Sequence, residues 1–141
     1  MPDINGEGVS VNAIGKRVRV MVVDDEPLIR EVVVDTIRFA GHEVVAVAVD
    51  GAEAVERAAE LRPDLVIMDV VMPRLSGVEA MEAMLEAGTA RSVALMSGEF
   101  RSLGLNRAEL LQRGAVALLE KPFSVTEVFE LLERASQGKL S

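Results

Sequence analysis

Short aliphatic runs alternate with longer amphipathic stretches along most of the chain. Each run has the length of a β-strand, and several are apolar at consecutive positions, which is typical of strands buried on both faces of a parallel sheet. The five runs are Val18–Val23, Val44–Val49, Leu65–Met68, Val93–Met96 and Val116–Leu119. They predict five strands, most of them fully buried.

The stretches between these runs predict helices. Their apolar residues recur at spacings of three and four, so that one face of each helix can pack on a sheet. The regular stretches are Ile29–Ala40, Ala54–Leu61, Gly77–Leu85 and Ser124–Leu132. The first three stop at Gly41, Pro63 and Gly88, residues that favour helix ends.

Polar residues mark two of the predicted helix starts. Ser124, with Glu127 three residues later, forms a capping box. Asn106 and Glu109 indicate a cap for a helix between the fourth and fifth strands, after an irregular entry. The order strand–helix, five times over, predicts an α/β fold with a doubly wound parallel sheet and helices on both faces. Such sheets bind ligands at the carboxyl ends of their strands.

Composition limits the classes of protein to which the chain can belong. Its 141 residues suit one domain, and 50% of them are hydrophobic, enough for a sizeable core. The net charge of −8 disfavours non-specific binding to nucleic acid or to anionic membranes. The lack of cysteine and the single histidine exclude disulfides, thiolate sites and multi-histidine zinc sites. No apolar run approaches the roughly 18 residues of a membrane span, so we expect a soluble, cytoplasmic protein.

We expect one folded unit over residues 16–137. Residues 1–15 are rich in small polar residues without a period, and they predict a disordered leader or a linker. Residues 138–141 would form a short tail. The single histidine, His42, follows Gly41 at a predicted helix end, where the helix dipole favours positive charge, and we expect it on the surface.

Three consecutive acids, Asp24, Asp25 and Glu26, follow the first predicted strand and precede Pro27. A helix start explains one of them, because aspartate favours the N-cap and proline the first turn. The start of a helix does not explain the neighbouring acids. A hard cation such as Mg²⁺, which prefers oxygen ligands, is a natural reason to gather carboxylates.

The third, fourth and fifth predicted strands also lead into polar residues: Asp69, Ser97 and Lys121. A turn cap is the alternative role for Asp69, and a solvated surface charge is the alternative for Lys121, one of only three lysines in the chain. Because parallel strands end at one edge, these side chains should converge with the acids of the first strand. The set suits Mg²⁺-assisted chemistry on a phosphoryl group, with a carboxylate as the attacking group.

Five motifs occur in order along the chain: Val22–Pro27, Asp50–Ala54, Val66–Pro73 with Gly77, Met96–Gly98 and Glu120–Phe123. In this set the sequence resembles the receiver domains of two-component response regulators, over about residues 17–135. The resemblance implies a flavodoxin-like (βα)5 fold whose five parallel strands take the order 2-1-3-4-5.

The resemblance also implies a Mg²⁺ site. Asp25, Asp69 and the backbone carbonyl of Val71 would bind the ion directly, while Asp24 would act largely through water. The chain would not be an enzyme beyond accepting and losing its own phosphoryl group.

Asp69 would be the phosphoacceptor, taking the group from a histidine kinase or a histidine phosphotransfer protein. Ser97 would donate a hydrogen bond to one phosphoryl oxygen and Lys121 would pair with another. A cis peptide would join Lys121 to Pro122, as is usual in the family.

The sequence departs from the family pattern in two places. Leu118 stands where an aromatic residue usually moves inward on activation, so Phe123, or Phe100 and its loop, would carry the change instead. The segment 98–106 is longer and richer in glycine than usual. A mobile segment and a partner-specific surface are both consistent with it.

Three functions therefore compete. The first is a phosphorylation-switched module that binds an unknown downstream protein, without direct contacts to nucleic acid or membrane, as a monomer or weak dimer. The second is a small Mg²⁺-dependent phosphatase with Asp69 as nucleophile, although Val71 stands where such enzymes usually place a general acid. The third is a degenerate, constitutive scaffold. No output domain fits in the chain, so we expect a stand-alone regulator or a piece of a longer protein.

Overall fold

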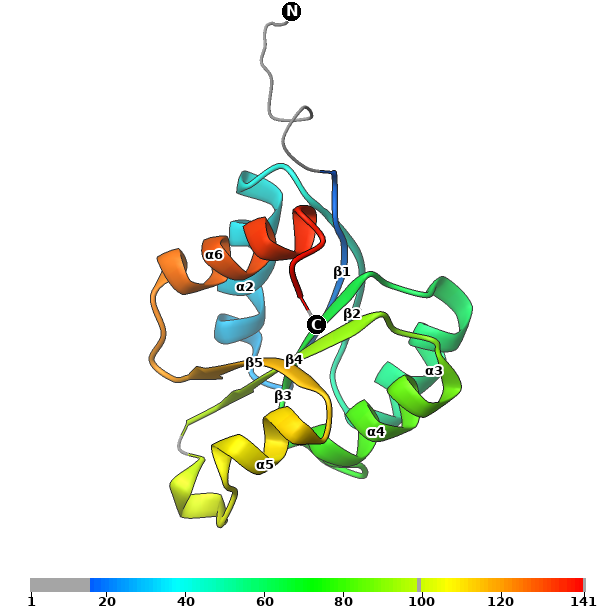
Figure 1. Cartoon of the computed structure of the whole chain (residues 1–141), viewed down its shortest axis with the longest axis vertical. Coiled ribbons are helices and arrows are strands. Elements are labelled where there is room, and N and C mark those ends of the chain that lie inside the picture. Colours follow the sequence, from blue (N-terminus) through cyan, green and yellow to red (C-terminus); the bar gives the residue numbers. More distant parts are fainter. Residues whose placement is uncertain (1–15, 99, 141) are drawn as a thin grey trace, which may run out of the picture.

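A computed structural model describes residues 16–98 and 100–140. Five parallel strands form one sheet in the order β2-β1-β3-β4-β5 (Figure 1), as the sequence predicts. The strands are β1 (Arg19–Val23), β2 (Glu43–Ala48), β3 (Leu65–Asp69), β4 (Ser92–Ser97) and β5 (Ala115–Glu120). Every residue of β3 and β4 is buried, which is why these strands are apolar at consecutive positions.

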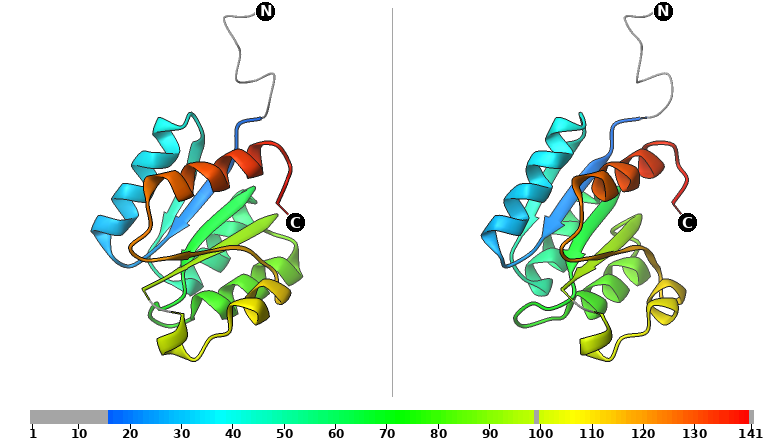
Figure 2. Two further views of the ribbon diagram at one scale, coloured as in Figure 1. Left: turned by 60° about the vertical axis from the view of Figure 1, so that its left-hand side comes forward. Right: turned by 90° about the vertical axis from the view of Figure 1, so that its left-hand side faces the viewer.

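Helices cover both faces of the sheet (Figure 2), so the fold is the doubly wound, flavodoxin-like α/β fold. The helices are α2 (Pro27–Phe39), α3 (Gly51–Leu61), α4 (Gly77–Ala87), α5 (Arg107–Gln112) and α6 (Val125–Ser136), with a 3₁₀ turn, η1 (Arg101–Leu103), before α5. α2 and α6 pack on one face around Ile37 and Leu131. α3, α4 and α5 pack on the other, where Met81 and Met84 are fully buried.

Two helices start at the predicted caps. Ser124 forms the predicted capping box with Glu127, and Ser76, where no cap was predicted, forms another with Glu79. Asn106 accepts a hydrogen bond from the backbone N–H of Glu109 and opens α5, so the irregular entry is the turn η1.

The start of α2 is different, and it bears on the three acids. Pro27 occupies the first turn, but the N-cap residue, Glu26, makes no capping hydrogen bond with its side chain. None of the three acids is therefore used to cap this helix with a side chain.

The expectation that His42 sits where positive charge is favoured is wrong. Its ring is half-buried, and Nδ1 accepts a hydrogen bond from the backbone N–H of Val18 at 3.0 Å. Burial, with the nearby charge of Arg17, lowers the pKa of His42. Burial and the charge of Arg17 therefore have a larger effect on this pKa than the nearby helix end.

The predicted leader, residues 1–15, lies outside the described residues, so the boundaries of the folded unit stay a prediction. Within the part of the chain that the structure describes, no helix has the length and apolar character needed to cross a membrane.

Candidate functional site

The pairing of the strands brings the polar strand ends together at one edge of the sheet. Val23 of β1 lies opposite Met68 of β3, so the residues that follow them, Asp24 and Asp69, are neighbours. On the other side of β3, β4 and β5 end in register, with Ser97 opposite Glu120. Residues separated by almost a hundred positions thus meet at the carboxyl edge of the sheet.

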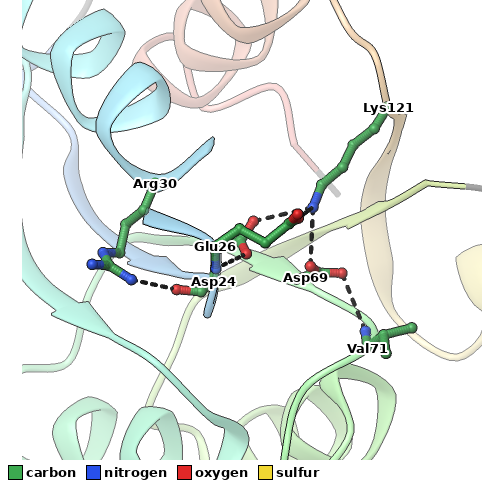
Figure 3. A network of polar contacts seen from close by, with 6 residues as sticks. All are labelled: Asp24, Glu26, Arg30, Asp69, Val71 and Lys121. Carbon is green, nitrogen blue, oxygen red and sulfur yellow. Dashed lines mark hydrogen bonds and ion pairs between the residues drawn. The ribbon is translucent and has the colours of Figure 1, made fainter. Parts of the chain in front are cut away.

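The ammonium of Lys121 occupies the centre of this edge (Figure 3). Its Nζ atom lies 3.0 Å from Oδ2 of Asp69, 3.2 Å from Oδ2 of Asp24 and 2.9 Å from Oε1 of Glu26. The lysine side chain is only 14% exposed. The predicted cis peptide joins it to Pro122, and its backbone N–H donates to the carbonyl of Ser97 at 2.7 Å.

Asp69 is held at both carboxylate oxygens. Oδ2 accepts from Lys121, and Oδ1 accepts from the backbone N–H of Val71 at 3.1 Å (Figure 3). The side chain is 7% exposed, so it is open to a small reactant but largely shielded from bulk water. A role as a turn cap explains the hydrogen bond from Val71 to Asp69, but it does not explain the ion pair between Asp69 and Lys121.

Asp24, Asp25 and Asp69 each place a carboxylate oxygen within 4.8 Å of the others. Asp24 is fully buried and Asp25 is exposed. Hard oxygen donors at this spacing, with an opening to solvent on the side of Asp25, fit a divalent cation such as Mg²⁺.

Burial and neighbouring charge perturb the titration of the pocket. Burial, reinforced by the negative charge of Asp69, raises the pKa of Asp24, against the effect of the hydrogen bond from the Glu26 N–H. Burial alone would lower the pKa of Lys121, but its hydrogen bonds to Glu26 and Asp69 and the surrounding acids raise it. The Lys121 ammonium therefore stays charged. The pocket favours a ligand that reduces the repulsion between its negatively charged acids.

Ser97 ends β4 and is buried at the strand next to Asp69. The structure thus places the predicted acids, the serine and the lysine at one edge, and it brings Lys121 into direct contact with Asp24 and Asp69.

Sequence reasoning missed two features of the site. One is the direct contact of Glu26 with Lys121. The other is the close approach of α4 to Asp69: a Cβ atom on Gly77 would lie 2.2 Å from the backbone oxygen of Asp69. The sequence does contain a signal for the close approach of α4. Gly77 follows the N-cap residue Ser76, at a position where helices favour alanine over glycine.

The segment after Ser97 also differs from the expected pattern. Phe100 is 2% exposed and belongs to the same hydrophobic cluster as the half-buried Leu118. The guanidinium of Arg107 lies 5.5 Å from the centre of the Phe100 ring and pairs with Glu120 at 3.9 Å. A hollow of about 470 Å³ opens beside the ring, lined by Gly98, Phe100, Arg101, Leu105, Arg107 and Glu120.

Comparison with known proteins decides the family. Residues 20–133 match the model of the response regulator receiver domain. The chain belongs to the response regulator receiver family. Receiver domains accept a phosphoryl group and act as switches between a kinase or phosphotransfer protein and a downstream target, and in general they are not catalytic enzymes.

Among its relatives, the transcriptional regulatory protein PdtaR of Mycobacterium tuberculosis is 42% identical over 117 residues, which cover 83% of this chain and 56% of PdtaR. This receiver thus spans little more than half the length of PdtaR. The chemotaxis protein CheY of Thermotoga maritima is 34% identical over 119 residues, covering 84% of this chain and 98% of CheY.

Solved structures agree with the receiver fold. The response regulator domain of Thermotoga maritima CheB superposes with a TM-score of 0.75 at 36% identity, over 88% of this chain and 97% of that domain. The chemotaxis response regulator CheY4 of Vibrio cholerae gives a TM-score of 0.72 at 31% identity, over 85% of this chain and 99% of CheY4.

Proposed function

We propose that this receiver is a phosphorylation-switched binding module in which Asp69 accepts a phosphoryl group in a Mg²⁺-dependent reaction. The observation that carries the proposal is the convergence of one ammonium and three aspartates at the end of β3. Asp69 is the member of this set that contacts Lys121, joins the candidate metal cluster and lies at the centre of the sheet.

In the proposed reaction a carboxylate oxygen of Asp69 attacks the phosphorus of a phosphohistidine on a histidine kinase or a histidine phosphotransfer protein. The P–N bond breaks as the new P–O bond forms, and the imidazole leaves with the electron pair and takes up a proton. Lys121 pairs with one phosphoryl oxygen and Ser97 donates to another.

Asp25, Asp69 and the backbone carbonyl of Val71 would hold Mg²⁺, with Asp24 acting largely through water. The ion, when bound, offsets the charge of the phosphoryl oxygens. The chain itself keeps the reacting carboxylate oriented through the N–H of Val71 and shields it from bulk water.

Two neighbouring features support a switched surface. Ser97 lies at the end of β4, and the hollow beside Phe100 begins at Gly98, the next residue. Recruitment of Ser97 to a phosphoryl group would move the entry to this hollow and change the surface formed by α5, β5 and α6. We propose that an unidentified downstream protein binds this surface, that nucleic acid and membranes do not, and that the receiver is a monomer or weak dimer.

The competing phosphatase function lacks a residue that it needs. Val71, two positions after Asp69, has an aliphatic side chain that is 56% exposed and has no proton to donate to a leaving group.

The test is incubation with acetyl phosphate and Mg²⁺, followed by intact-mass measurement of an acid-stable, base-labile adduct. We expect one adduct on the wild-type chain, none on Asp69→Asn and none without the metal. Asp64→Asn is the matched control, because that carboxylate lies at the opposite edge of the sheet and bonds to the backbone of Arg19. An adduct that persists in Asp69→Asn would refute the assignment, and rapid release of inorganic phosphate from general phosphoesters would favour the phosphatase.

A further inference from the structure

All the donors of the Lys121 ammonium are in use in the unphosphorylated protein. A lysine ammonium has three N–H bonds. In this structure it lies within hydrogen-bond distance of three separate carboxylates, those of Asp24, Glu26 and Asp69. A phosphoryl oxygen that binds Lys121 must therefore take the place of one of these partners.

Asp24 and Asp69 are poor candidates for release. Asp24 is fully buried, and its other oxygen accepts the N–H of Glu26 at 2.9 Å. Asp69 is itself the proposed acceptor, so it stays beside the lysine once it carries the phosphoryl group.

Glu26 has the opposite properties. Its side chain is 60% exposed, and it makes no capping bond at the start of α2. Among the contacts recorded for the described residues, the only partner of its carboxylate is Lys121, at the shortest of the three distances, 2.9 Å. Release would leave the carboxylate in water, where solvation replaces the lost hydrogen bond.

We propose that Glu26 is an internal competitor of the phosphoryl group, holding one donor of Lys121 in the resting protein and releasing it when Asp69 is modified. This inference rests on the proposed function of Asp69. Glu26 acts through Lys121 and is therefore a positioning residue. The Glu26–Lys121 contact must break before Lys121 can bind the phosphoryl group. The free energy of that contact therefore weakens binding of the phosphoryl group.

Beryllofluoride, an analogue of a phosphoryl group on a carboxylate, tests the competition at equilibrium. Its affinity for the full chain is measured with saturating Mg²⁺ for the wild type, Glu26→Gln and Glu26→Asp. Glu26→Asp keeps the charge but shortens the side chain by one methylene, which removes the contact. Because exposed ion pairs are weak, we expect both variants to bind beryllofluoride about two- to fivefold more tightly than the wild type.

A second readout follows the lysine itself. The chain has only three lysines, Lys16, Lys121 and Lys139, so the side-chain NMR signal of Lys121 is assignable by single Lys→Arg variants of the other two. We expect this signal to shift in both Glu26 variants before any anion is added. Glu31→Gln, which neutralises an exposed acid on α2, should leave the affinity and the signal unchanged.

The outcomes separate the alternatives. Tighter binding by Glu26→Gln alone, with Glu26→Asp equal to the wild type, would assign the effect to general charge and overturn the competition. Unchanged or weaker binding by both variants would also overturn it, while the wild type would still bind the analogue. Failure of the wild type to bind beryllofluoride at all would instead refute the proposed function, and the inference with it.

Discussion

The two edges of the sheet use the same kinds of charged residue in different ways. At the amino edge, Arg19 and Asp64 are joined by reciprocal contacts: the N–H of Arg19 donates to Asp64 Oδ2, and the N–H of Asp64 donates to the carbonyl of Arg19. The guanidinium of Arg19 donates to the carbonyls of Leu61 and Arg62. At the carboxyl edge, Lys121 pairs with the carboxylates of Asp24, Glu26 and Asp69. Two of these, Asp24 and Asp69, also lie close to each other and to Asp25.

The two edges differ in the kind of group that pairs with their charged side chains. Charges at the amino edge are matched by backbone groups whose positions the strands and helices fix, so they hold elements together. Charges at the carboxyl edge are matched by other side chains, with more acids than the single lysine can neutralise. We expect such a set to exchange one partner for a metal ion or an anion, as the proposed function requires.

Replacement of Lys121 by methionine should have the largest effect on stability. It leaves the buried carboxylates of Asp24 and Asp69 without their cation, and we expect the free energy of unfolding at neutral pH to fall by about 3 kcal/mol. Urea unfolding measures the change, with the exposed Lys139→Met as control, for which we expect less than about 0.5 kcal/mol. Added Mg²⁺ should recover part of the loss. An equal loss in both variants would show that Lys121 is an ordinary surface charge.

Gly77→Ala tests whether the carboxyl edge depends on close packing of α4. The added methyl group meets the backbone oxygen of Asp69 at 2.2 Å, so either the helix or Asp69 must move. We expect a loss of about 2 kcal/mol in urea unfolding, together with slower phosphorylation. Gly98→Ala, where nothing lies within 4 Å of the new atom, is the matched control and should be nearly neutral. Similar stabilities of the two variants would contradict this view of Gly77.

The amino edge should respond to mild acid through His42. Its pKa is lowered in the folded protein, so below about pH 6.5 the unfolded chain binds the proton more readily. The stability that the neutral ring contributes is complete above that pH and is lost as the pH falls through the folded pKa, by at most about 1.4 kcal/mol per pH unit. Urea unfolding from about pH 7.5 to about pH 5 should show a steeper loss for the wild type than for His42→Gln. Parallel curves would show that the ring does not titrate differently on folding.

The smallest effect compares two arginines with left-handed backbone, one near each edge. The side chain of Arg74, with φ of 70°, donates twice to Asp50 Oδ2, whereas the side chain of Arg62, with φ of 48°, makes one long contact of 3.4 Å to the carbonyl of Gly88. Glycine relieves the backbone in both. We expect Arg62→Gly to raise the thermal midpoint slightly and Arg74→Gly to lower it slightly, because only Arg74→Gly also loses a pair of hydrogen bonds. If Arg74→Gly is more stable than Arg62→Gly, the hydrogen bonds of Arg74 to Asp50 do not outweigh the strain of its backbone.

The fold was predictable because its signals are local and repeated. Consecutive apolar residues identified β3 and β4, and the caps at Ser124 and Asn106 identified the starts of two helices. The gathering of Asp24, Asp69 and Lys121 was predictable as well, because parallel strands end together and the family motifs occur in order.

What could not be predicted depends on contacts between distant segments. The turn after β1, where the N–H of Glu26 donates to Asp24, determines that Asp24 and Glu26 contact Lys121. The hydrogen bond that His42 accepts comes from Val18, and Phe100 is buried in a hydrophobic cluster that includes Leu118. No pattern in the sequence near Glu26, His42 or Phe100 indicates these contacts.

Arg107 links the segment that follows β4 to the end of β5, outside the pocket around Asp69. Its guanidinium contacts Phe100, three residues after Ser97, and Glu120, the residue before Lys121. One side chain at the first turn of α5 therefore contacts the segment that follows Ser97 and the residue that precedes Lys121, the two residues proposed to bind the phosphoryl group. A displacement of either strand end would therefore change a contact of the same side chain, so the first turn of α5 is linked to both.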